Sequence, residues 1–262
     1  MDMLSVEHVG FRYQAANGEV EAFRDISFSV PRGQFISIVG PSGCGKSTLL
    51  SLIAGLLPYE HGSITINGEK VSGISPHIGY MLQQDNLLEW RTIWDNVLFG
   101  LEIQKNVTDN TILHAENLLK TYGLYDFRDK YPRQLSGGMR QRVALIRTLA
   151  SGPDILLLDE AFSALDFQTR LSVTDDVYRI LKAEGVTMLM VTHDIPEAVA
   201  MGDVVLILSE RPAYVKELLP LDFGSKRSPL LCREDPVFSQ YFSHIWKELR
   251  DNEEKQNDIS SF

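Results

Sequence analysis

Short apolar runs recur along the chain and are separated by longer stretches with helical periodicity. The runs occupy residues 35–39, 155–158, 186–191 and 204–208. Their length and apolar character are typical of buried parallel strands. Between two of the runs, residues 168–184 place apolar side chains on one helical face. Strands that alternate with helices predict an α/β fold whose parallel sheet is covered on both faces.

The first part of the chain departs from this alternation. Residues 4–13 and 20–30 have strand character, and Asn17-Gly18 between them is a hairpin signal. Residues 63–67 alternate between polar and apolar side chains, as an edge strand does. These features predict a smaller antiparallel β region beside the parallel sheet.

A helical insertion and a C-terminal extension complete the predicted domain organisation. Ile93, Val97 and Leu101 begin a long stretch of apolar residues at helical spacing, so we predict a mostly helical insertion at about 91–150. The insertion interrupts a main domain over residues 1–230. Residues 231–262 are predicted to form a C-terminal helix and a polar tail, mobile from residue 251.

A glycine-rich loop follows the first apolar run and precedes a helical stretch. It fits the G-x-x-x-x-G-K-[ST] phosphate-binding pattern, whose glycines and helix amides accommodate an anion. Lys46 supplies a positive charge for the β- and γ-phosphates, and the Ser47 hydroxyl is suited to Mg²⁺. An ordinary glycine turn is the alternative, but the strand–loop–helix context favours a nucleoside triphosphate site. The predicted ATP-binding loop consists of Gly40, Pro41, Ser42, Gly43, Cys44, Gly45, Lys46, Ser47 and Thr48.

Two further motifs carry charge or open amides. Asp159 and Glu160 follow a buried strand, where ligands bind in open α/β sheets. Asp159 can then hold Mg²⁺ and Glu160 can accept a proton from water, although both could also cap the next helix. Ser136 precedes two glycines at the start of another helix, which predicts either a second anion site or a capped helix.

Composition restricts the possible partners. The chain has 262 residues and a formal net charge of -10, so we expect no general affinity for nucleic acid. No apolar run approaches the length of a membrane span, and the first residues lack the pattern of a signal peptide. Cys44 and Cys232 are expected to be free thiols, and the six histidines show no metal-ligand spacing.

These motifs, in this order and at this spacing, resemble the ATP-binding cassette (ABC) ATPases over roughly residues 3–210. The resemblance implies a P-loop NTPase of ABC type, with a mostly parallel core, an antiparallel β subdomain and a helical subdomain. It implies ATP and Mg²⁺ as ligands and two nucleotides held between two copies of the chain. Ser136 and Gly138 of one copy would face the γ-phosphate held by Lys46 of the other. The signature loop that does this consists of Leu135, Ser136, Gly137, Gly138 and Met139.

The resemblance also implies roles for isolated residues. Gln83 matches a glutamine that contacts Mg²⁺ and the membrane partner, although Gln84 is beside it. Asp166 matches a residue that crosses the dimer interface, although a helix cap would suffice. His193 matches the histidine that orients the γ-phosphate, although a lone histidine is more often structural.

Tyr13 resembles the aromatic residue that stacks on adenine. We prefer it to Phe11, which we expect on the opposite strand face. One residue departs from the family pattern: Ala161 follows Glu160 where proline is usual. Proline would stiffen this strand exit, whereas alanine does not enforce its backbone angles.

Residues 83–92 are similar to importer segments that receive the permease. Leu87, Leu88 and Trp90 are apolar in this polar loop, which fits a protein-binding groove or, alternatively, packing against the helical insertion. Residues 126–142, 162–170 and 245–249 are most similar to the nitrate/sulfonate/taurine importer group, which includes carriers of thiamine-precursor pyrimidines.

The resemblance therefore implies an importer ATPase that acts as a homodimer. It would bind two integral-membrane permease subunits through Gln83–Thr92 and serve an extracytoplasmic substrate-binding protein. Its place would be the cytoplasmic face of the membrane. The alternative is an ABC ATPase of a non-import system, either an exporter or a nucleic-acid-linked protein. A non-catalytic subunit is disfavoured by the presence of Lys46, Asp159, Glu160 and His193.

Overall fold

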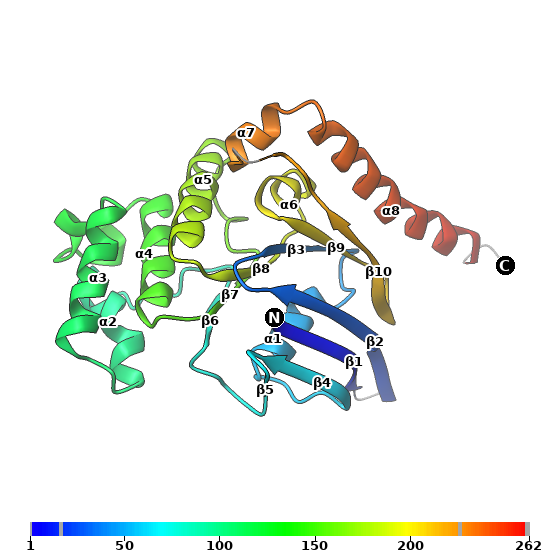
Figure 1. The fold of residues 1–262 in the computed structure, drawn as a ribbon, viewed down its shortest axis with the longest axis horizontal. Coiled ribbons are helices and arrows are strands. Elements are labelled where there is room, and N and C mark those ends of the chain that lie inside the picture. Colours follow the sequence, from blue (N-terminus) through cyan, green and yellow to red (C-terminus); the bar gives the residue numbers. More distant parts are fainter. Residues whose placement is uncertain (1, 16–17, 225–226, 260–262) are drawn as a thin grey trace. The chain divides into compact units, whose positions relative to one another are not determined.

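The computed structural model describes residues 2–15, 18–224 and 227–259 (Figure 1). The chain divides into two compact units, one of Met1–Ser75 with Tyr178–Phe262 and one of Pro76–Val177. Asn17 of the expected hairpin turn lies outside the described residues. The two strands it was expected to join are nevertheless paired antiparallel, as predicted.

Antiparallel strands make up one part of the first unit. β1 (Asp2–Ala15) pairs with both β2 (Gly18–Pro31) and β4 (His61–Ile66). The prediction of β4 as an edge strand was wrong, because the short β5 (Glu69–Lys70) pairs with its outer side. Alternation shows that one face is buried but does not show how many neighbours a strand has.

Parallel strands form the centre of the same unit. β3 (Phe35–Val39) lies between β8 (Thr187–Val191) and β9 (Val204–Leu208) and runs parallel to both. Every residue of β3 and β8 is buried, which explains their continuous apolar sequence. The sequence did not reveal β10 (Ala213–Pro220), which pairs antiparallel with β9.

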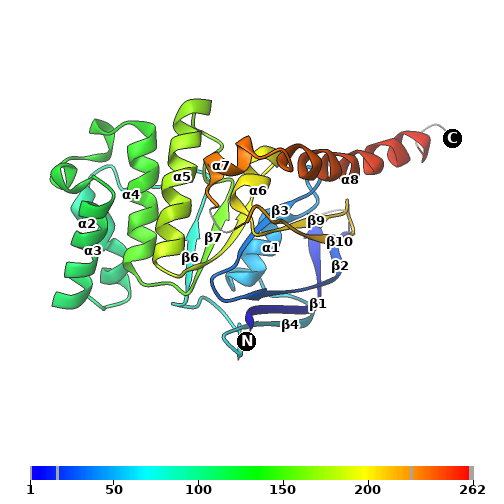
Figure 2. The same cartoon turned by 45° about the horizontal axis from the view of Figure 1, so that its top comes forward.

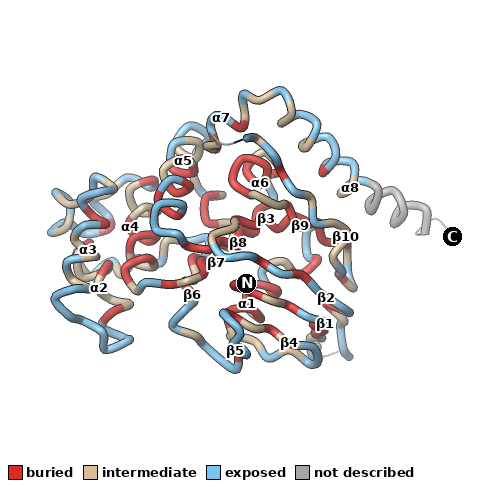
Figure 3. The backbone as a smooth tube through the Cα atoms, viewed as in Figure 1, coloured by how far each residue is buried: buried red, intermediate tan, exposed pale blue. Residues whose placement is uncertain are grey.

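Helices of the first unit pack around this central sheet. α1 (Lys46–Ile53) follows the glycine-rich loop, and α6 (Ile195–Met201) follows β8. Figure 3 shows α6 as almost wholly buried. Near the C-terminus, α7 (Pro229–Glu234) precedes α8 (Phe238–Ile259), so the helix continues through most of the segment expected to be a mobile tail.

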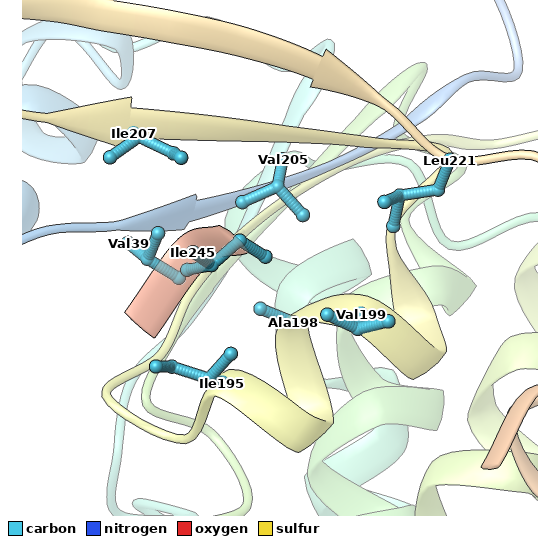
Figure 4. Close-up of a cluster of buried hydrophobic side chains, with 8 residues drawn as sticks. All are labelled: Val39, Ile195, Ala198, Val199, Val205, Ile207, Leu221 and Ile245. Atoms are coloured by element: carbon cyan, nitrogen blue, oxygen red, sulfur yellow. The ribbon is translucent and has the colours of Figure 1, made fainter. Parts of the chain in front are cut away.

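An apolar cluster, called here the C-terminal cluster, joins α8 to α6 and the sheet (Figure 4). Ile245 of α8 is fully buried at its centre. Fully burying such a side chain contributes about 1.5–3 kcal/mol. The members of the cluster are Val39, Ile195, Ala198, Val199, Val205, Ile207, Leu221 and Ile245.

The second unit contains a parallel strand pair and the predicted helical insertion. β6 (Ile78–Met81) runs parallel to β7 (Ile155–Asp159). Between them come α2 (Ile93–Ile103), α3 (Asp109–Thr121) and α4 (Gly137–Ala150), which lie side by side in Figures 1 and 2. Two 3₁₀ turns, Tyr125–Phe127 and Pro132–Gln134, connect α3 to α4. α5 (Phe167–Ala183) begins in this unit, and Gly185 just beyond it has a φ of 67°, which suits a helix stop.

Candidate nucleotide-binding site

The glycine-rich loop curls between β3 and α1 in the first unit. Gly43 and Gly45 have φ values of 75° and 114°, which side chains other than glycine rarely adopt. A Cβ at Gly45 would also lie 2.8 Å from the Phe23 ring. The loop therefore needs glycine at position 45 for both its backbone angle and its packing.

Lys46 points back across this loop. Its Nζ donates hydrogen bonds to the carbonyl oxygens of Gly40 at 2.8 Å and Pro41 at 3.0 Å. The neighbouring Cys44 thiol is buried, and burial raises its pKa, although the Lys46 charge opposes this. Both cysteines are free thiols, as the sequence predicted, and the structure shows that both are buried.

His193 lies at the same sheet edge as the loop. β3 and β8 are parallel neighbours, with Ile38 opposite Val191, and the loop and His193 follow the carboxyl ends of these strands. The backbone N–H of Thr192 donates to Ile38 O at 3.3 Å. Lys46 and His193 are therefore brought to one edge, where α/β proteins bind ligands.

Tyr13 is half-buried, and its hydroxyl is hydrogen-bonded to the Thr48 hydroxyl at the start of α1. The expectation that Phe11 faces the opposite side was wrong. The two rings meet edge to face with centroids 4.8 Å apart, because residues two apart on a strand share a face. Phe11 is buried, so Tyr13 presents the more accessible ring.

The second unit assembles the predicted acidic residues and glutamine at the carboxyl ends of its own parallel strand pair. Met81 pairs with Leu158 across the parallel strands β6 and β7, so Gln83 and Asp159 both follow at the carboxyl ends. Tyr80 donates a hydrogen bond to Asp159 Oδ2 at 3.3 Å. Glu160 has a φ of 49°, a left-handed conformation that turns the chain sharply after the strand.

Gln83 connects to the segment after Glu160. Its Nε2 donates to Ser163 Oγ at 3.1 Å, and Ser163 Oγ donates to Glu160 O at 2.9 Å. Asp166 further along caps α5, since its Oδ1 accepts from Thr169 N at 3.0 Å. Hydrogen bonding to Thr169 also lowers the pKa of Asp166.

The signature residues open α4 in the same unit. Ser136 is the predicted N-cap, and its hydroxyl accepts from Met139 N at 3.3 Å. A Cβ at Gly138 would lie 2.8 Å from Thr169 Cγ2, so glycine permits this close approach. Leu135 and Gly137 flank the cap, and the first amides of α4 have no intrahelical acceptor.

The apolar residues of segment 83–92 separate into two kinds. Leu87 is 7% exposed, which favours the packing alternative over docking for this residue. Leu88 is half-buried. Trp90 is 75% exposed, which is unusual for so large an apolar side chain.

Comparison with known proteins decides the family. The family model described as "ABC transporter" matches residues 23–163, which is more than half of the chain. The chain belongs to the ABC transporter ATPase family. Members hydrolyse ATP to ADP and phosphate and couple hydrolysis to transport, and the chain is accordingly an ATP-binding ATPase.

Relatives extend the similarity over almost the whole chain. It is 46% identical to the ABC transporter ATP-binding protein YtlC of Bacillus subtilis, over 98% of this chain and 99% of that protein. It is 40% identical to the taurine import ATP-binding protein TauB of Escherichia coli K12, over 90% of this chain and 92% of that protein. The similarity to the taurine/sulfonate group therefore confirms the group resemblance that the sequence predicted.

Solved structures agree with the fold. The dimeric ATP-binding cassette MJ0796 bound to ADP and phosphate is 30% identical, with a TM-score of 0.72, over 85% of this chain and all of that one. The cbiO1 protein of Clostridium perfringens, part of an ABC transporter complex, has a TM-score of 0.74 at 26% identity, over 84% of this chain and 88% of that one. These neighbours confirm the P-loop ABC fold.

Two residues of α4 that the sequence did not single out contact the functional segments. Gln141 is buried, and its Nε2 donates to the carbonyl oxygen of Ala161, directly after Glu160. Arg147 donates to the backbone of segment 83–92. Both lie within a regular helical pattern, so nothing in the sequence distinguishes them from surface or core positions.

Proposed function

We propose that this ABC ATPase energises an importer for a small anionic or heterocyclic solute, such as nitrate, a sulfonate or taurine, or a thiamine-precursor pyrimidine. The observation that supports this most directly is its 40% identity to a taurine import ATPase across 90% of the chain. Within the described residues no helix has the length and apolar character of a membrane span. The proposal therefore assigns membrane passage to two separate permease subunits, with this chain bound at their cytoplasmic face.

The proposed ATPase site has two parts, one from each half of a homodimer. Residues 1–230 act as the ATPase domain, with the insertion at about 91–150 supplying the signature loop. The loop at Gly40–Thr48 and Lys46 bind the phosphates of ATP, His193 orients the γ-phosphate, and Tyr13 stacks on adenine. Ser136 and Gly138 of the other copy approach the same γ-phosphate, where open helix amides stabilise negative charge. The dimeric state of the ADP-bound structural relative supports this arrangement.

Glu160 is the proposed general base for the attacking water. Its neighbours Asp159 and Gln83 offer oxygen ligands at one sheet edge, and the Ser47 hydroxyl offers another beside the phosphates. Oxygen donors of this kind suit Mg²⁺, which would neutralise phosphate charge when bound. We assign Ser47, Gln83 and Asp159 to this ion.

Substitutions at Lys46 and Glu160 test the roles proposed for these two residues. Lys46→Ala removes the phosphate-binding charge and should abolish ATP binding in equilibrium dialysis. Glu160→Gln should bind ATP but hydrolyse it about 10²–10⁴ times more slowly, because it cannot accept a proton. Normal affinity in the first variant or normal turnover in the second would exclude the corresponding role.

Reconstitution tests the importer proposal itself. The chain should restore ATP-dependent uptake when combined with its permease pair and binding protein in vesicles, assayed with taurine, nitrate and a pyrimidine in turn. ATP-driven efflux instead would favour the alternative non-import function.

Trp90 provides a test of permease docking. Trp90→Ala should leave basal ATPase activity unchanged and weaken permease binding, because the indole is exposed on segment 83–92. Trp246→Ala is the matched control, since Trp246 is half-exposed on α8, away from this segment in sequence. Equal permease affinity in all three proteins would remove the docking role.

A further inference from the structure

One arginine side chain from α4 binds two successive backbone carbonyls of segment 83–92. Arg147 Nη1 donates to the carbonyl oxygen of Asn86 and Nη2 to that of Asp85, each at 2.7 Å. Burial lowers the pKa of Arg147, and the Asp85 carboxylate opposes this shift. A charged group that is partly desolvated makes stronger hydrogen bonds than one in water. The two bonds therefore hold the two carbonyls in one fixed orientation.

The backbone conformation of Asn86 presents the two carbonyls to Arg147. Asn86 has a φ of 46°, in the left-handed region that asparagine tolerates better than most residues. This turn directs two successive carbonyls toward one guanidinium group. The planar fork of arginine reaches both acceptors, whereas a lysine ammonium is a single point charge.

Packing around the contact is incomplete. A cavity of about 450 Å³ lies between residues 83–87, the start of α4 and the turn at Ala164 and Leu165. Across it, Arg140 forms an ion pair with Asp85, with 3.0 Å between Nε and Oδ2. Polar side chains thus connect the segment to α4 at this cavity.

The same helix reaches the catalytic and signature residues. Its first turn is the signature loop, and Gln141 one turn later bonds to Ala161 O beside Glu160. A rigid helix transmits a displacement at one end to the other. A pull on Asp85 and Asn86 is therefore carried through Arg147 to the turn that would meet the second nucleotide.

We infer that Arg147 is a positioning residue that makes segment 83–92 and the signature helix α4 move as one body. This rests on the proposed function, because it takes permease docking at segment 83–92 as the event that is transmitted. Arg147 itself has no part in binding ATP or in the chemistry. Its removal uncouples the permease from the signature loop while the loop at Gly40–Thr48 keeps its affinity.

The two hydrogen bonds from Arg147 to Asp85 O and Asn86 O are called the clamp here. Hydrogen–deuterium exchange on the isolated full chain tests the clamp without any permease. Arg147→Met and Arg147→Lys should each raise amide exchange in residues 84–92 about tenfold or more, because two charge-assisted bonds are lost or halved. Exchange in α4 should stay at the wild-type level. Arg142→Met is the matched control, since Arg142 lies on the same helix and forms an ion pair with Asp176 of α5.

Two results would overturn the clamp. One is unchanged exchange in residues 84–92 of a folded Arg147 variant. The other is a rise of the same size throughout α4, which would mean that Arg147 only stabilises the helix. If Arg147→Met does not fold, Arg147→Lys retains the charge and the stem and decides the question.

A second measurement tests the coupling. In vesicles with the permease pair, Arg147→Lys should lower solute uptake per ATP hydrolysed about fivefold or more, with the KM for ATP unchanged. Unchanged uptake per ATP would contradict the inference. Failure of wild-type reconstitution would count against the proposed importer function, whereas the exchange experiment would still judge the clamp.

Discussion

Two parts of this ABC ATPase are held in place by different kinds of contact, the first by apolar packing and the second by polar contacts. The C-terminal cluster of Ile245 and its neighbours is wholly apolar and supports Val39, just before the phosphate loop, and α6, just after His193. Segment 83–92 is instead held by Arg147, Arg140 and Asn96 through hydrogen bonds and an ion pair.

The difference concerns what each kind of contact can specify. Apolar burial is not directional, so it adds stability in proportion to area and fixes a region as a whole. Hydrogen bonds fix particular carbonyls but contribute less net free energy. A phosphate loop needs a stable support, whereas segment 83–92 needs a fixed orientation for the role inferred above. The comparison therefore predicts large stability effects in the first region and local, orientational effects in the second.

The largest effect is expected from Ile245→Ala. It leaves a cavity in the C-terminal cluster and should lower the free energy of unfolding by about 2–5 kcal/mol, measured by urea denaturation. Leu231→Ala, at a leucine that is 53% exposed on α7, is the matched control and should change it by less than about 0.5 kcal/mol. Similar losses of unfolding free energy in the two variants would show that α8 contributes little to the stability of the C-terminal cluster.

A smaller and more local effect is expected from Asn96→Ala. This fully buried amide accepts from Leu88 N at 2.7 Å and donates to Leu88 O at 3.1 Å and Thr92 O at 2.9 Å. Its loss leaves backbone groups unpaired and should cost about 1–3 kcal/mol.

The location of the change matters more than its size in this variant. Amide exchange should rise in residues 87–92 and stay unchanged in α8, the reverse of the Ile245→Ala pattern. Exposed Asn110→Ala on α3 is the control. If amide exchange in Asn96→Ala rose equally in both units, the effect of Asn96 would be global, and the proposed difference between the two regions would be wrong.

Periodicity and motif spacing predicted most of the elements in both regions. β3 spans Phe35–Val39, the limits of its apolar run, because every residue of a central parallel strand is buried. β10 was missed because its polar and apolar residues alternate irregularly at a half-exposed sheet position. The length of α8 was also missed, since its polar C-terminal residues lack the apolar periodicity that indicates a helix in sequence.

The residues of the candidate site also divide into those that the sequence could predict and those that it could not. The phosphate loop and Ser136 were predictable because glycines and caps have local backbone requirements. Asn96 and Arg147 were not, because their partners are backbone carbonyls of another segment, and any polar residue at a helical position has the same sequence signature. Leu87 and Trp90 show the same limit, since neighbouring apolar residues differ in exposure only once the loop is folded.

The smallest expected effect concerns alkaline pH and again separates the regions. Burial raises the pKa of Tyr178 to about 12, and it also raises the pKa of the Cys44 and Cys232 thiols. All three residues belong to the unit that carries the phosphate loop. Because the folded state holds these protons more tightly than the unfolded chain, the unfolded chain ionises first. The stabilisation is complete below the unfolded pKa values and falls as the pH rises through the folded ones.

The test is the free energy of unfolding between pH 7 and pH 11. The wild-type value should begin to fall above about pH 8.5, where unfolded cysteine thiols ionise, and should fall further above about pH 10, where an unfolded tyrosine ionises. Tyr178→Phe should fall less steeply there, because phenylalanine keeps the edge contact with Phe35 and has no proton to lose. Tyr214→Phe is the control, since Tyr214 is 53% exposed and should leave the slope unchanged. Parallel curves for wild type and Tyr178→Phe would show that Tyr178 does not carry the alkaline sensitivity, and would leave the Cys44 and Cys232 thiols of the same unit as its source.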